Sequence, residues 1–308
     1  MLDITVVIAT YNRCRRLART LQALAGLDSL GLRWELVVAD NNSSDATAQV
    51  CRDWQGRLPL TYVFEPRQGK NHANNAALAA AGGELIVMTD DDITPCAAWL
   101  KELWKASIRW PEHDLFCGPV ITPIPPAFAG TLEGAVPTCN FRPPGSEQRV
   151  LESDQMPIGA NLALRRRCLA PAGPGGQPLF DPAIGPSGAD RISGSESVAL
   201  KALLEGGRRI VYAPRAVVVH ETPAGFRSIA GLCRRAYAQG RGDVRVHRFG
   251  QASPPLLGVP RFVLRRMIED FAAALGHLFA GRRKAALGRL FHGVRFLAIC
   301  REWRKERT

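Results

Sequence analysis

Three consecutive aspartates, Asp90, Asp91 and Asp92, follow a short apolar run that spans residues 85–88. Neighbouring carboxylates repel one another unless a cation lies between them. Mg²⁺ and Mn²⁺ prefer oxygen ligands and are commonly shared with the phosphates of a substrate. The alternative is a solvated acidic turn that caps a helix starting near Pro95. Taken alone, the three aspartates do not decide between these interpretations.

Two further polar groups follow apolar runs in the same way. They are Thr10-Tyr11-Asn12 after residues 4–9 and Asp40-Asn41-Asn42 after residues 36–39. Ligands of parallel α/β sheets bind beyond the carboxyl ends of the strands, so these groups are expected to meet at one edge. That convergence favours a metal site at the aspartates. His220 follows another apolar run, residues 216–219, where an imidazole would complete the metal site, contact phosphate or serve only structure.

The residues around these motifs predict an α/β domain with a mostly parallel sheet. Apolar, β-branched runs indicate buried parallel strands, and apolar residues at helical spacing lie between them. The expected strands are residues 4–9, 36–39, 60–64 and 85–88, and the expected helices are residues 12–27, 45–54 and 71–81. This alternation is typical of a sheet covered by helices. Residues 119–188 are rich in Pro and Gly and are expected to form long loops around a strand at 161–164.

Several segments, in order along the chain, resemble the motifs of glycosyltransferase family 2. They are Val6–Arg13, Glu35–Asp45, Gly69-Lys70 with Ala73-Asn74-Asn75, Thr89–Asp92, Gly159–Arg166, and Tyr212–Pro214 with Val219-His220. The ordered set is more specific than any single motif. The resemblance implies the GT-A fold, in which a Rossmann-like nucleotide-binding half merges with an acceptor-binding half. It also implies an inverting glycosyltransferase with a nucleotide-sugar donor.

The resemblance also implies roles for residues that would bind the nucleotide. Thr10, Tyr11 and Asp40 should border the base, with Asp40 accepting a hydrogen bond from uracil, so a UDP-sugar is the preferred donor. The alternative for Asp40 is a helix cap before Ser43. Asn12, Asn42 and Asp91 complete the residues expected around the donor.

Further roles concern the sugar, the diphosphate and the metal. Asp90 should contact the ribose or the donor sugar. Asp92, together with His220, should bind Mg²⁺ or Mn²⁺ between the two phosphates. Lys70 should lie near the diphosphate, and its alternative is an exposed lysine at the start of a helix.

Glu196 is the expected catalytic base. Family members carry Glu-Asp ahead of a helix, whereas this chain reads Ser195-Glu196. Counting back without gaps from residues 209–212 places Glu196 on the family's aspartate. A glutamate can accept the same proton, with one more methylene of reach. The alternative is a first-turn carboxylate that the helix dipole favours, and Asp190 is the second candidate for the base.

The excess positive charge lies in the C-terminal part of the chain. The chain of 308 residues has a formal net charge of +12. Residues from Phe226 onward hold 18 lysines and arginines against 5 acidic residues, whereas the preceding part holds 22 against 23. This shift predicts a catalytic domain over residues 1–225, with halves at about 1–118 and 119–225, and a basic region over 226–308.

Apolar residues recur at helical spacing after Pro260 and again after Gly281, with arginines among them. This pattern predicts two basic amphipathic helices. Such helices suit the headgroup region of an anionic membrane, which would fit a lipid-linked acceptor. The alternative is that their apolar faces pack on the catalytic domain or on a second subunit.

The remaining features narrow the class of protein. No apolar stretch is long enough to span a bilayer, and the N-terminus has the pattern of a first strand. Eight scattered cysteines without a C-x-x-C pair indicate reduced thiols. An N-terminus without the pattern of a signal peptide predicts the cytoplasm, and the basic amphipathic helices would place the protein peripherally on the inner face of the cell membrane. No aromatic platform accompanies the basic residues, which argues against nucleic-acid binding.

Two other functions stay open. A nucleotidyltransferase also binds a nucleotide and a metal on an α/β sheet, but no Gly-rich basic phosphate loop follows the first apolar run. A non-catalytic nucleotide-sugar-binding protein would explain the altered Glu-Asp pair. For the enzyme itself, saccharide, lipid-linked and small-molecule acceptors remain alternatives.

Overall fold

The computed structural model describes residues 2–169, 178–182, 195–222, 224–247, 255–256 and 258–305. The chain forms two compact units, and each is described by itself. Unit 1 contains the described residues of 2–122, 139–182 and 195–221. Unit 2 contains residues 123–138 and the described residues from Thr222 onward.

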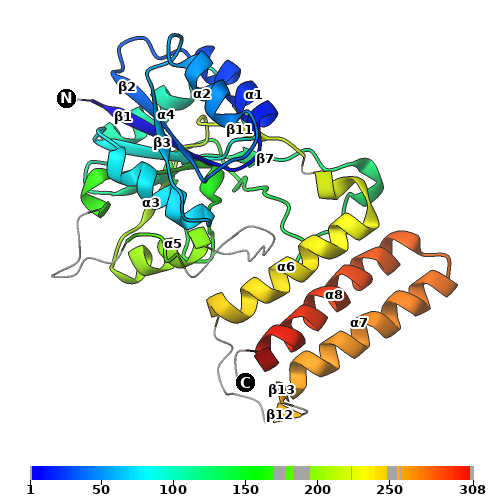
Figure 1. The fold of residues 1–308 in the computed structure, drawn as a ribbon. Helices are drawn as coiled ribbons and strands as arrows, with labels where there is room; N and C mark the ends of the chain where they lie inside the picture. The colour runs from blue at the N-terminus through cyan, green and yellow to red at the C-terminus, as the bar shows by residue number, and fades with distance from the viewer. Residues whose placement is uncertain are drawn as a thin grey trace. The chain divides into compact units, whose positions relative to one another are not determined.

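An eight-stranded sheet forms the centre of unit 1, with the strand order β3-β2-β1-β4-β9-β6-β10-β8 (Figure 1). The strands are β1 (Ile4–Thr10), β2 (Trp34–Asp40), β3 (Leu60–Phe64), β4 (Leu85–Thr89), β6 (Leu115–Cys117), β8 (Arg149–Val150), β9 (Leu162–Arg165) and β10 (Ile210–Tyr212). Strands β1 to β4 pair in parallel, as do β6 and β10, whereas β9 and β8 run antiparallel to their neighbours. The predicted α/β fold with a mostly parallel sheet is therefore confirmed.

Helices cover both faces of this sheet. They are α1 (Cys14–Ala25), α2 (Thr47–Trp54), α3 (Lys70–Ala80), α4 (Trp99–Arg109) and α5 (Ser195–Glu205). Successive side chains of a strand point to opposite faces. Accordingly, Val6 and Ile8 pack with α1, α2 and α4, and Val7 packs with α3 and α5. Helix α1 begins later than the pattern predicts, because Asn12 has a left-handed backbone with φ of 50°.

A smaller three-stranded sheet lies in the same unit and has the order β5-β11-β7. Its strands are β5 (Ile93–Pro95), β7 (Val120–Ile121) and β11 (Val218–His220). Strand β5 follows directly after the three aspartates, and it pairs antiparallel with β11 so that His220 lies opposite Ile93. This pairing brings His220 beside Asp92, although 127 residues separate them in the chain.

The Pro- and Gly-rich segment of unit 1 contains the predicted strand. It is β9, which a short 3-10 helix, η2 (Gly159–Asn161), precedes. The side-chain amide of Asn161 donates to the carbonyls of Pro119 and Ala216, and its carbonyl accepts from the Trp99 indole. Asn161 therefore holds the entry to β9 in place.

Unit 2 is mainly helical. It contains η1 (Pro126–Phe128), η4 (Ala224–Arg227), α6 (Ile229–His247), α7 (Arg261–Phe279) and α8 (Arg283–Lys305), with the short strands β12 (Pro255–Leu256) and β13 (Val259–Pro260). Helix α8 packs against both α6 and α7 (Figure 1). The two helices expected after Pro260 and Gly281 are present as α7 and α8. The sequence pattern does not predict α6, which carries few large apolar residues.

Close packing and buried ion pairs join α6 to α8. A side chain at Gly240 would place its Cβ 2.2 Å from the carbonyl oxygen of Arg295, so only glycine permits this approach. Asp243 is 1% exposed and forms an ion pair with Arg295, whose Nε lies 2.6 Å from Asp243 Oδ2. A buried carboxylate without such a partner would be strongly destabilising.

Among the described residues, no helix combines the length and apolar character that crossing a bilayer requires. The eight cysteines are free thiols.

Candidate active site

The carboxyl ends of β1, β2 and β4 form one edge of the large sheet. Thr10 pairs with Asp40 in register, and Ile8 pairs with Thr89 at the end of β4. The Thr10 hydroxyl donates to Asp91 Oδ2 at 2.8 Å, so the first strand is tied to the aspartates. The polar strand ends therefore meet as the sequence predicts.

The turns after β1 and β2 are joined to each other. Asn12 donates its backbone N–H to Ser43 Oγ, and Ser44 donates its backbone N–H to Asn12 Oδ1 at 2.7 Å. Asn12 and Asn42 both have left-handed backbones, with φ of 50° and 62°. Asparagine tolerates this conformation better than most residues do. Asn12 is thus a cross-link between the two turns.

Asp40 is buried, and the protein itself uses both of its carboxylate oxygens. Oδ1 accepts from the Ser43 N–H at 3.0 Å, and Oδ2 accepts from the Tyr62 hydroxyl at 2.8 Å. Helix α2 begins only at Thr47, so Asp40 stabilises the turn after β2 and is not the helix cap that the sequence offered as an alternative. Tyr11, Asn12 and Asn42 are exposed at this edge. A contact between Asp40 and uracil stays a prediction.

Asp90, Asp92 and His220 form a group of ligands, here called the metal cluster, that fits one divalent metal ion. One ligand atom from each lies within 4.8 Å of the other two. His220 Nε2 lies 3.2 Å from Asp92 Oδ1 and 3.6 Å from Asp90 Oδ2. Asp92 Oδ1 is buried and has no hydrogen-bond partner, which leaves its charge toward the centre of the cluster. Oxygen and imidazole ligands of this kind suit Mg²⁺ and Mn²⁺.

The orientation of His220 also suits metal binding. Its Nδ1 lies 2.9 Å from the carbonyl oxygen of Glu221, so a proton on Nδ1 is held there and Nε2 faces the two aspartates. Burial opposes the charged imidazolium, but the hydrogen bond to Asp90 and the charges of Asp90 and Asp92 raise the pKa of His220 to about 9. At neutral pH an incoming ion would therefore displace a proton.

Asp91 does not belong to this cluster. Its Oδ1 pairs with Arg13 Nη1 at 2.7 Å, and its Oδ2 accepts from Thr10. Burial raises the pKa of the Asp91 carboxyl against the opposing charge of Arg13. Asp91 thus ties the turn to β1, and the structure places it in contact with the protein rather than with the metal cluster.

Three arginines frame the aspartates, and sequence reasoning missed them. Arg13 and Arg16 pair with Asp92 Oδ2 at 3.1 and 2.8 Å, and Arg19 pairs with Glu221 at 2.7 Å. Arg16 Nε lies 3.6 Å from Glu221 as well. Their spacing of three residues, from Arg13 directly before α1 to Arg19 within it, is the signal that could have identified them.

Lys70 connects the metal cluster to the expected base. Its Nζ lies 2.9 Å from Asp90 Oδ1 and 2.8 Å from Glu196 Oε1. Lys70 is the first residue of α3, and Glu196 lies in the first turn of α5, which covers the same face of the sheet. Burial opposes ionisation of Glu196, but the Lys70 charge holds the pKa of that carboxyl below its usual value. The structure therefore brings Lys70, Asp90 and Glu196 together.

Gly159 leaves the space that the Glu196 side chain occupies. A Cβ at this position would lie 2.6 Å from Glu196 Cγ. Gly159 opens η2, and the next carbonyl, that of Ala160, accepts from the Thr89 hydroxyl at the end of β4. The end of β4 and the start of η2 thus fix the space for Glu196. Asp190, the second candidate for the base, lies outside the described residues.

Glu221→Gln should weaken Mn²⁺ binding by at most about tenfold, because Glu221 acts through Arg16, and losing a direct partner of a metal ligand costs about 10–100-fold. The neutral amide holds Arg16 less firmly, and Arg16 in turn orients Asp92. Electron paramagnetic resonance of free Mn²⁺ measures the affinity directly. Glu84→Gln is the matched control, because Glu84 pairs with Arg165 at the opposite end of β4. Equal Mn²⁺ affinity in both variants would contradict the role of this frame.

Comparisons with known proteins agree with this geometry. The family model described as Glycosyl transferase family 2 matches residues 5–167. The pre-mycofactocin glycosyltransferase of Mycobacterium tuberculosis is 25% identical over 285 residues, which are 90% of this chain and 54% of that protein. The validoxylamine A glucosyltransferase of Streptomyces hygroscopicus is 36% identical over 105 residues, 33% of this chain and 25% of that protein. This chain thus spans only part of these relatives' length.

A solved structure shares the fold over most of the chain. The mannosyltransferase of Pyrobaculum calidifontis, in complex with GDP-Man and Mn²⁺, superposes with a TM-score of 0.60 at 23% identity and covers 96% of this chain and 86% of its own. At this identity the likeness shows a GT-A fold. The family match extends over more than half of the 308 residues, from β1 through β9. This chain belongs to glycosyl transferase family 2.

Proposed function

We propose that this chain is an inverting, metal-dependent glycosyltransferase that moves a sugar from a nucleotide-diphosphate sugar to an acceptor hydroxyl. The observation that carries the proposal is the position of Lys70 between Asp90 and Glu196, at 2.9 and 2.8 Å. A metal ligand and a carboxylate base are thereby placed beside the same small volume, as a displacement at one carbon atom requires.

Asp90, Asp92 and His220 would hold Mg²⁺ or Mn²⁺. When bound, such an ion offsets the negative charge that develops on a departing diphosphate. Support for this kind of ion comes from two structural neighbours whose complexes contain Mn²⁺, the mannosyltransferase with GDP-Man and a glucosyl-3-phosphoglycerate synthase with UDP. Stabilisation measured with each ion separately distinguishes Mg²⁺ from Mn²⁺.

Glu196 is the proposed base. Its carboxylate takes the proton of the acceptor hydroxyl while the acceptor oxygen forms a bond to the anomeric carbon. The bond from that carbon to the diphosphate breaks with its electron pair on the leaving oxygen. Attack from the face opposite the leaving group inverts the configuration, so no covalent sugar–enzyme intermediate is needed.

Lys70 links donor binding to this step. Its ammonium group pairs with Glu196 and weakens that carboxylate as a base. A donor diphosphate offers Lys70 a competing anion of higher charge. Once Lys70 turns toward the diphosphate, its charge no longer lowers the pKa of Glu196, and the Glu196 carboxylate becomes a stronger base. Acceptor activation therefore follows donor binding.

The donor is proposed to be a UDP-sugar whose uracil ring would lie near the exposed residues Tyr11 and Asn42. The acceptor is proposed to be a saccharide or a lipid-linked saccharide, met at the inner face of the cell membrane. Neighbouring structures are complexes with UDP-GlcNAc and with GDP-Man, so the test includes both nucleotides.

A thermal-shift screen of nucleotide sugars, with and without Mn²⁺ or Mg²⁺, tests the donor and the metal together. A ligand present at about 100 times its Kd stabilises the folded state by about 2.7 kcal/mol. We expect UDP-sugars to raise the Tm only when the metal is present. Stabilisation by a nucleotide sugar without any transfer or donor hydrolysis would indicate a non-catalytic binding protein. No stabilisation by any nucleotide sugar would reject the proposal.

A further inference from the structure

Helix α7 of unit 2 presents apolar side chains on two adjoining faces. One face packs on α8, where Val263 and Ala274 are buried. The other carries a row of apolar residues, here called the α7 stripe: Leu264, Ile268, Phe271, Leu275, Leu278 and Phe279. Leu264 and Phe271 are half-buried at its border, where Phe271 packs beside Gly293 of α8, whereas the other four are exposed. These positions recur every three or four residues, so they lie along one side of the helix.

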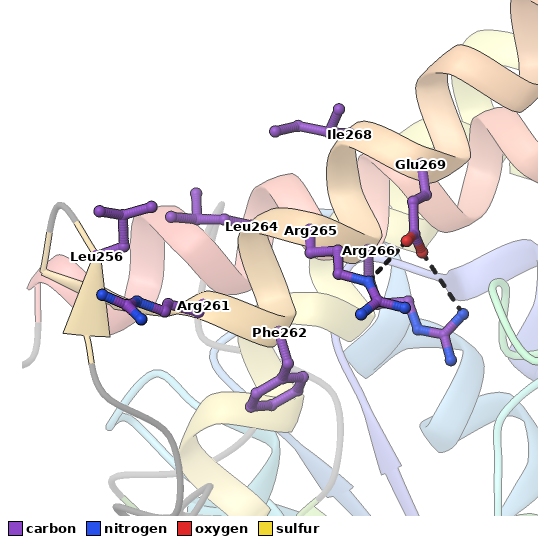
Figure 2. A pocket seen from close by; sticks show the side chains of 8 residues that line it. All are labelled: Leu256, Arg261, Phe262, Leu264, Arg265, Arg266, Ile268 and Glu269. Atoms are coloured by element: carbon purple, nitrogen blue, oxygen red, sulfur yellow. Dashed lines mark hydrogen bonds and ion pairs between the residues drawn. The ribbon is translucent and has the colours of Figure 1, made fainter.

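The exposure of the α7 stripe is large for residues of this type. Ile268 is 62% exposed, Leu275 and Leu278 are each 57% exposed, and Phe279 is 89% exposed. Figure 2 shows Leu264 and Ile268 projecting from the same side of α7, with Leu256 of β12 beside Leu264. A continuous apolar row of this kind marks a surface that another apolar phase or molecule covers.

Basic residues surround the α7 stripe. Arg261 and Arg265 lie near its N-terminal end. Arg282, which precedes α8, and Arg283 and Lys284, which begin it, follow shortly after Phe279, and all five basic residues are exposed. Glu269 pairs with Arg265 at 2.7 Å and with Arg266 at 3.8 Å, as Figure 2 shows. Glu269 is the only acidic residue on the exposed surface of α7. The surface thus combines an apolar centre with a strongly positive margin.

We propose that the α7 stripe and the basic turn at residues 282–284 dock on an anionic lipid bilayer. The helix would lie in the plane of the headgroups, with Ile268, Leu275 and Phe279 inserted among the acyl chains. The arginine and lysine side chains would reach back to lipid phosphates. Both halves of the surface then find a partner, because a bilayer of this kind is apolar inside and negatively charged at its surface.

Charge argues against the two other occupants. A second copy of this chain would bring one basic margin against another, and like charges across an interface oppose association. A nucleic acid would pair with the arginines but would leave the aliphatic centre of the stripe against a phosphate backbone. Docking on the bilayer would bring the enzyme to a lipid-linked acceptor. That consequence rests on the proposed function, whereas the docking itself does not.

Vesicle flotation of the full chain tests the proposal. The probes are vesicles of phosphatidylcholine alone and vesicles that also contain phosphatidylglycerol, each at low and high NaCl. We expect binding to the anionic vesicles, weakened by salt, and little binding to the neutral ones. Equal binding to both kinds, or none to either, would overturn the proposal.

Two sets of substitutions separate the apolar and the charged contributions. Arg282→Gln, Arg283→Gln and Lys284→Gln together should weaken binding about 100-fold, since each basic residue near an anionic surface contributes about fivefold. Leu275→Ser with Phe279→Ser should weaken binding at least about tenfold. Leu30→Ser is the matched control, because Leu30 is an 87% exposed leucine of unit 1.

Three further readouts keep the outcomes distinct. Circular dichroism tests whether the variants fold. We expect them to fold, because the changed residues are exposed. Sedimentation velocity detects self-association, and a stripe variant that dissolves an oligomer while vesicle binding persists would assign the surface to a second copy instead. The thermal shift with nucleotide sugar reports the proposed function separately, and it should stay at the wild-type value in every stripe variant.

Discussion

Glu196→Gln should lower kcat by about 10²–10⁴-fold while nucleotide-sugar binding persists. Glutamine has nearly the same shape as glutamate but cannot accept the acceptor proton. Loss of this carboxylate also removes one of the two anions that hold Lys70, so that Asp90 alone competes with the donor diphosphate for the ammonium group. Donor affinity should therefore hold or rise while turnover falls. Steady-state transfer assays and the thermal shift with donor measure the two quantities separately.

A control on the same helix separates catalysis from structure. Glu205→Gln changes the last residue of α5, an exposed glutamate that pairs only loosely with Lys201, and it should leave kcat unchanged. The pH profile provides a second criterion. The acidic limb of kcat reports a base that must be deprotonated, so it should be present in the wild type and absent in Glu196→Gln. Near-normal turnover of Glu196→Gln would reject the assignment of the base.

The part of this site that the sequence predicts follows from the geometry of parallel strands. Thr10, Asp40 and Asp90 each follow an apolar run, and parallel strands place such ends at one edge. His220 reaches Asp92 in a different way, because β11 belongs to the smaller sheet and pairs antiparallel with β5, the strand that follows the aspartates. Local patterns thus determine which side chains meet, because the sheet order leaves them little freedom.

The direction of neighbouring side chains is harder to predict. Asp90, Asp91 and Asp92 are identical in type, yet Asp91 turns to Thr10 and Arg13 while the other two face His220. The backbone of one tight turn decides this difference, and no periodicity records it. The sequence therefore locates the acidic motif without assigning its members.

Long-range ion pairs escape local patterns for a related reason. Arg19 and Glu221 are 202 residues apart, and Lys70 and Glu196 are 126 apart. Each pair depends on how helices α1, α3 and α5 are placed on the sheet. Helix α6 is missed on different grounds, since Gly240 weakens its helix propensity and is needed for the close approach of α8. Tertiary packing overrides local preference there.

Asp92→Asn should reduce kcat/KM about 1,000-fold, which corresponds to about 4 kcal/mol of transition-state stabilisation. The buried Asp92 Oδ1 faces His220 without a hydrogen-bond partner, so its charge is directed at the centre of the metal cluster. An amide removes that charge and keeps the shape. Direct titration of Mn²⁺ should show a parallel loss of affinity, and Asp92→Asn should need far more Mn²⁺ than the wild type for half-maximal activity.

Chelation of the wild type provides the complementary measurement. Activity should disappear in chelator and return when Mn²⁺ or Mg²⁺ is added in excess, whereas Asp92→Asn should recover little under the same conditions. Asp114→Asn is the matched control, because Asp114 also pairs with two arginines, Arg167 and Arg208, away from the metal cluster. A general weakening of the fold would lower the activity of both variants alike. A selective loss in Asp92→Asn requires a cation at this cluster, and full wild-type activity in chelator would rule it out.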